Sequence, residues 1–138
     1  MDERIRAEYR FQLEHGGMRV GHQAEDALER ARARVLLHDL EDAGRAAIQW
    51  EHDPDPDVSW LDERGLEELR DGTTEILQGL VTIDGRTAAI GGVHVYARGH
   101  GGGYLRVLEA ELTGEILEEI RGEEREERAR WAAVGVQL

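Results

Sequence analysis

The sequence contains no cysteine and no lysine, only two prolines, and a single serine at position 59. The absence of cysteine excludes disulfides, thiolate metal ligands and cysteine nucleophiles. No apolar run approaches the length of about 18 residues that a membrane-spanning helix needs, and the N-terminus is charged rather than signal-like. Aromatic residues make up 5% of the chain, so aliphatic side chains must build the core. We therefore expect a soluble, cytoplasmic protein with one domain spanning residues 1–138.

All 17 basic residues are arginines, and 30 acidic residues give the chain a net charge of −13. This acidity argues against direct binding to nucleic acid, because phosphates need basic side chains for neutralisation. The same charge attracts a protein partner with a basic surface. Acidic solubilisation without any partner is the alternative explanation of the charge.

Residues 76–96 form the only long segment that is nearly free of charge. Asp84-Gly85 lies in its middle, between two apolar runs, and this is the strongest short-range signal for a β-hairpin with a two-residue turn. The alternation of apolar residues changes phase at Gly91-Gly92. We interpret these two glycines as a β-bulge, which adds one residue to a strand and restores the phase.

The other elements follow from periodicity. Alternating apolar residues over residues 6–14 predict a half-buried strand. The remaining patterns predict a helix, a strand, a short helix and a long final helix over residues 22–43, 46–52, 60–69 and 104–133, the last bent or interrupted at Gly122. The expected fold is α+β, with an antiparallel sheet of about four strands, a central bulged hairpin, and two main helices packed on one face.

The segment Asp53-x-Asp55-x-Asp57 is similar to the start of a calcium-binding loop. Such a loop needs glycine at its sixth position and glutamate at its twelfth, where this chain has Val58 and Arg64. We therefore expect no bound metal and no cofactor. The alternative is a metal-dependent hydrolase built on a cluster of His52, Asp53, Asp55 and His94.

Residues 100–103 read His-Gly-Gly-Gly, which matches the oxyanion element of lipases and esterases. Ser59 does not lie in the G-x-S-x-G turn that these enzymes require, so the match does not predict catalysis. The glycines precede a helix, where backbone N–H groups can hold an anion, but a flexible connection is the simpler interpretation.

Three segments carry a resemblance to a group of known proteins: residues 55–62 (DPDVSWLD), 91–93 (GGV) and 104–112 (YLRVLEAEL). Together they resemble small acidic proteins of unknown function from phages and other mobile elements. The resemblance covers roughly residues 50–119. It implies an accessory protein of a virus or mobile element and supplies no catalytic residue.

The leading hypothesis is a non-enzymatic interaction protein that binds a basic surface, for instance as an inhibitor of a protein that handles nucleic acid. Acidic side chains on rigid elements are the best candidates for binding, because they lose little entropy when a partner docks. These candidates are Asp53, Asp55 and Asp57 on the proline-stiffened loop, and Glu115, Glu118, Glu119 and Glu123 on the final helix. A homodimer formed through the C-terminal helix and the apolar residues 131–138 is a further alternative.

Overall fold

The computed structural model describes residues 1–16, 23–99 and 103–135. In this part of the chain the fold is α+β, as expected, with four helices and a three-stranded antiparallel sheet. The elements in chain order are α1 (Glu3–His15), α2 (Gln23–Asp42), β1 (Ala46–His52), α3 (Glu63–Arg70), β2 (Thr74–Ile83), β3 (Arg86–Tyr96) and α4 (Tyr104–Ala133). No helix among the described residues is long and apolar enough to cross a membrane.

The strand order is β1-β2-β3, so the hairpin β2-β3 supplies the middle strand and one edge of the sheet rather than lying at its centre. The turn between its strands is confirmed at Asp84 and Gly85, whose φ angles are 48° and 82°. Positive φ at both positions is what a two-residue turn needs to match the twist of its strands. The short turn fixes the register in which Ile83 pairs with Arg86.

The register of the hairpin changes farther from the turn, between Leu77 and Gly79 of β2. Leu77 pairs with Val93 and Gly79 pairs with Ile90, so Gly91 and Gly92 of β3 both lie opposite Gln78. Val93 and Val95 thereby return to the face of the sheet that the helices cover, and both are buried.

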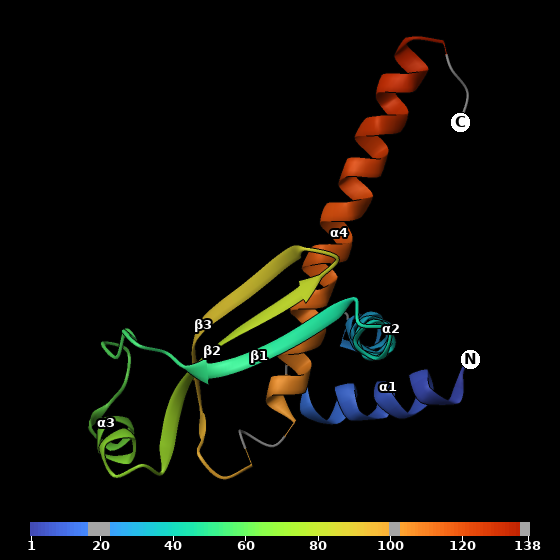
Figure 1. Ribbon diagram of the computed structural model, residues 1–138. Helices are drawn as coiled ribbons and strands as arrows, with labels where there is room; N and C mark the ends of the chain where they lie inside the picture. Colours follow the sequence, from blue (N-terminus) through green and yellow to red (C-terminus); the bar gives the residue numbers. More distant parts are fainter. Residues whose placement is uncertain (17–22, 100–102, 136–138) are drawn as a thin grey trace.

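Helices α2 and α4 lie against one face of the sheet, and α1 packs on α2 (Figure 1). The core between sheet and helices is aliphatic, as the shortage of aromatic residues predicts. Its two clusters consist of Leu37, Leu40, Val81, Ile83, Ala88, Leu112 and Ile116, and of Leu77, Val93, Val95 and Leu108.

The predicted strand over residues 6–14 is wrong, because this segment belongs to helix α1. Asp2 caps the N-terminus of this helix, because its side chain accepts a hydrogen bond from the Arg4 N–H at 2.7 Å. Its inner face carries Glu8 and Gln12, four residues apart and both buried. Because this buried face is polar, the apolar residues of α1 do not follow the helical period. Their alternation over residues 6–14 therefore indicated a strand. The loss of this strand reduces the expected four strands to the three described.

Two further predictions need correction. The short helix α3 begins at Glu63 rather than at Trp60, because the side chain of Asp62 caps it by accepting from the Gly65 N–H at 2.7 Å. Helix α4 is a single helix of 30 residues and continues through Gly122 without the expected interruption.

Candidate functional site

The loop after β1 is held to the sheet by Asp53. The Asp53 N–H donates to the Ile76 carbonyl at 2.9 Å, and its carboxylate accepts from the Asp55 N–H at 3.1 Å and from the Gly92 N–H at 3.2 Å. The carboxylate thus reaches across β2 and binds the backbone of β3 where the register changes. Asp53 therefore has a structural role that the sequence did not reveal.

The next turn of this loop presents a tryptophan to solvent. Asp57 accepts hydrogen bonds from the Ser59 hydroxyl at 2.7 Å and from the Ser59 N–H at 3.0 Å, and these bonds, the first more than the second, hold the pKa of Asp57 below its usual range. The Trp60 indole N–H donates to the Asp57 carbonyl at 2.8 Å, and its ring meets the His94 ring edge-on at 5.6 Å. Trp60 is nevertheless 57% exposed. Tryptophan is among the residue types that contribute most to binding at protein interfaces.

Residues 51–71, which we call the acidic end, hold more than half of the net charge of the chain. They comprise nine acidic residues and two arginines, a net charge of −7 out of −13. The segment includes the loop and α3, which packs on β2, and it lies at one end of the sheet (Figure 1). Asp55, Glu63 and Glu67 are exposed carboxylates in this segment. The local count of acidic and basic residues is the signal in the sequence that indicates this segment.

The four predicted glutamates of α4 lie in a different electrostatic setting, because arginines of the same chain pair with three of them. Arg86 binds Glu123 at 2.7 Å and lies 3.7 Å from Glu119. Glu118 pairs with Arg125 at 3.2 Å and with Arg121 at 3.4 Å. Arg125 first, and Arg121 second, keep the pKa of Glu118 low, and Arg86 does the same for Glu123.

Glu115 is the member of this set that is exposed and has no ion pair among the described residues. The two predicted acidic arrays also lie apart, because Glu119 and Glu123 contact Arg86 at the start of β3, whereas Asp53 binds Gly92 farther along that strand. The structure therefore does not join them into one site. Of the two, the array containing Asp55 keeps the greater uncompensated charge.

The residues of the alternative metal cluster are not brought together. The His52 ring bonds to the Glu75 carboxylate at 2.7 Å, and the His94 ring bonds to the Thr74 hydroxyl at 2.7 Å. Within residues 1–16, 23–99 and 103–135, no group of three or more histidine or acidic side chains is arranged to hold a metal ion. Most of the predicted His-Gly-Gly-Gly loop lies outside the described residues.

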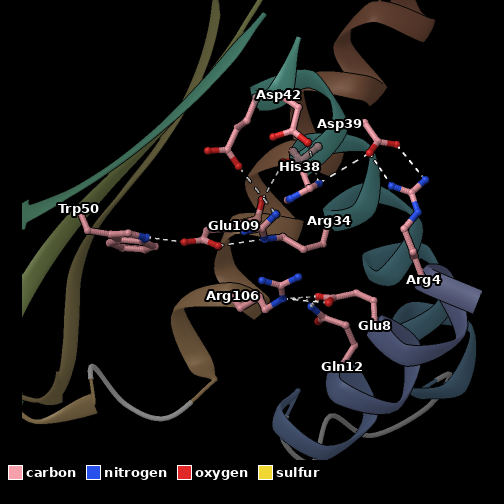
Figure 2. A network of polar contacts seen from close by, with 12 residues as sticks. Arg4, Glu8, Gln12, Arg34, His38, Asp39, Asp42, Trp50, Arg106 and Glu109 are labelled. Atoms are coloured by element: carbon pink, nitrogen blue, oxygen red, sulfur yellow. Dashed lines mark hydrogen bonds and ion pairs between the residues drawn. The ribbon is translucent and has the colours of Figure 1, made fainter. Parts of the chain in front are cut away.

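A polar network that the sequence did not predict lies between the sheet and the helices (Figure 2). Glu109 of α4 accepts from Arg34 Nε of α2 at 3.0 Å and from the Trp50 indole N–H of β1 at 2.8 Å. The side chains of Arg34 and Glu109 are only 9% and 12% exposed. A Cβ atom on Gly79 would lie 2.4 Å from the Trp50 ring, so glycine is needed for the indole to reach Glu109. The network connects β1, α2 and α4.

A second part of this network fixes α1 to the other helices. Arg106 Nε of α4 binds both carboxylate oxygens of Glu8, at 2.8 and 2.9 Å, and the Glu8 carboxylate also accepts from the Gln12 amide at 3.1 Å. Arg30 of α2 donates to the Gln12 side chain at 2.9 Å. The buried polar face of α1 is therefore satisfied by arginines from two helices, which accounts for its unusual sequence pattern.

Comparisons of this chain with protein families, with curated proteins and with solved structures found no match.

Proposed function

We propose that this protein is a non-enzymatic interaction protein and that its acidic end binds a basic surface of another protein. The observation that carries the proposal is the net charge of −7 within residues 51–71, on a segment that also exposes Trp60. Fixed negative charge accelerates association with a basic partner, and an exposed tryptophan supplies apolar contact and cation–π attraction for arginine or lysine.

The local hydrogen bonds support this proposal because they make the acidic end rigid. Asp53 and Asp57 hold the loop in one conformation, so Asp55 and Trp60 project from a backbone that does not have to be ordered when a partner binds. Binding by a preorganised surface loses less conformational entropy than binding by a flexible one. We therefore assign Asp55, Trp60, Glu63 and Glu67 to the contact surface, with Asp53 and Asp57 as its supports.

The kind of partner follows from the same chemistry. A basic groove that binds phosphates also attracts carboxylates, so a protein that handles nucleic acid fits this surface and would be inhibited by it. The resemblance to small acidic proteins of phages and mobile elements is in line with such an inhibitor. The proposal predicts competition between this protein and duplex DNA for the groove.

The experiment compares two variants with equal net charge. One carries Asp55→Asn, Glu63→Gln and Glu67→Gln, and the control carries three neutral substitutions at exposed positions elsewhere: Glu14→Gln, Glu29→Gln and Glu115→Gln. The probe is a synthetic peptide of alternating arginine and glycine, titrated by calorimetry at low and high salt. We expect the first variant to lose at least tenfold in affinity and the control to bind almost as the wild type. Equal losses in both variants would show that only the overall charge matters, and would refute a local binding surface.

A further inference from the structure

The last turns of α4 project from the folded body (Figure 1). We call residues 121–134 the arm; every residue in it is exposed except Gly122, which is half-buried. Earlier in the same helix, side chains such as Leu112 and Ile116 are buried in the core. The arm therefore continues a packed helix into solvent.

The face of α4 that packs on the core continues along the arm. Val134 follows Ile116 by eighteen residues, which is five full turns at 3.6 residues per turn, so both lie on the same side of the helix. Trp131 follows the partly buried Ile120 by eleven residues, about three turns, and lies beside the same line. Val134 is 69% exposed and Trp131 is 42% exposed. Nothing among the described residues covers this side of the arm.

We propose that the arm of a second copy of this chain covers this face, in an antiparallel pair. If a two-fold axis passes between Arg125 and Glu126, Ile120 of one copy lies opposite Trp131 of the other. The same symmetry repeats this contact at the other end of the pair. Each copy thus contributes one Ile120 and one Trp131, and the pair contains two contacts between these residues.

The charges of the arm are complementary in this arrangement. Glutamates predominate near the body of the protein and arginines near the tip, so antiparallel packing brings the tip of each arm to the acidic half of the other. Glu124 lies within one residue of the position opposite Arg128 and on the same flank of the stripe. On the other flank, Arg130 lies between the positions opposite Glu119 and Glu123. Within one copy, Glu119 and Glu123 also contact Arg86, whereas Glu124, Arg128 and Arg130 make no ion pair among the described residues.

A parallel pair is excluded by the shape of the molecule. The apolar side of the arm faces the same direction as the side of α4 that carries the sheet and α2. Two parallel arms joined along this side would require both folded bodies to occupy the same space. Antiparallel arms place the bodies at opposite ends. The proposal is independent of the acidic end, which lies far from the arm (Figure 1).

The first test measures the mass of the full-length protein by sedimentation velocity over a dilution series. We expect a reversible dimer, a dissociation constant at least tenfold higher for Trp131→Ala, and a similar weakening for Arg128→Glu. Arg125→Glu is the matched control, because it makes the same change of charge on the opposite side of the arm. Circular dichroism of each variant establishes that it is folded. A wild-type protein that is monomeric throughout, or a control that weakens the dimer as much as Arg128→Glu does, would overturn the proposal.

The second test determines the direction of the arms and uses the absence of native cysteine. Glu124→Cys and Arg128→Cys are prepared separately, mixed, and oxidised. Antiparallel arms predict that the mixed disulfide between the two variants predominates. Predominant cross-linking of each variant with itself would contradict the antiparallel pair.

Discussion

The substitution Glu109→Gln tests the buried network between sheet and helices most sharply. Each oxygen of the Glu109 carboxylate accepts from a different donor: Oε1 from Arg34 and Oε2 from Trp50. Glutamine has almost the same shape but only one acceptor oxygen, so its amide N–H₂ must face one of these two donors. The change also leaves the Arg34 guanidinium, which is 9% exposed, without a compensating negative charge at that distance.

Removing one partner of a buried ion pair typically costs about 3–5 kcal/mol, because the remaining charge stays buried. Glutamine keeps one of the two hydrogen bonds, and Glu41 lies 4.0 Å from Arg34, so we expect a loss of about 2–4 kcal/mol in the free energy of unfolding. Equilibrium unfolding in urea, followed by far-UV circular dichroism, measures this loss.

The control is Glu115→Gln on the same helix, where the side chain is exposed and the change should stay within about 0.5 kcal/mol. The double variant Arg34→Leu with Glu109→Leu should be less destabilised than the sum of its two single variants, because it leaves no unpaired charge. If Glu109→Gln were as harmless as Glu115→Gln, the pair would not be buried in solution, and the packing of β1 against α2 and α4 would be wrong.

Three further predictions concern α4. Leu112 is 3% exposed in the larger core cluster, so Leu112→Ala should lower the free energy of unfolding by about 2–5 kcal/mol in urea melts. Gly114→Ala should raise it by about 0.5–1 kcal/mol, since an added Cβ meets no atom within 4 Å and alanine favours a helix interior. The hydrogen bond from Arg86 holds the pKa of Glu123 below its usual range, so the pair stabilises the fold above the ordinary glutamate pKa, and this contribution is lost as pH falls through the lowered value. A carboxyl NMR titration should show that pKa return to its usual range in Arg86→Ala, and an unchanged titration would contradict the ion pair.

The sequence predicted those elements whose apolar residues follow one clear period. β1, the turn of the hairpin, and the helices α2 and α4 were expected at nearly their observed positions, because core contacts and the Asp84-Gly85 turn determine them locally. Helix α1 was mistaken for a strand because its buried face carries Glu8 and Gln12. Their partners Arg106 and Arg30 lie far along the chain, and no local pattern reveals such contacts.

The candidate site was only partly predictable for the same reason. The rigidity of the proline-containing loop was expected, but the role of Asp53 depends on Gly92, which is 39 residues away. The sequence predicted that the glutamates of α4 were available to bind a partner. In the structure, Arg86 at the start of β3 forms ion pairs with two of them, Glu119 and Glu123. The sequence did not predict Trp60 as a binding residue, because the exposure of its side chain depends on how the loop crosses the sheet.

The binding role of the acidic end can be tested directly through the indole N–H signals of the three tryptophans in an NMR titration with the arginine–glycine peptide. Trp60 lies in the acidic end, Trp50 lies in the buried network and Trp131 lies in the arm. We predict that the Trp60 signal and the backbone signals of residues 53–71 shift progressively with added peptide, while the signals of Trp50 and Trp131 stay in place. Shifts spread evenly over the surface, or confined to α4, would contradict the assignment of the acidic end as the binding surface.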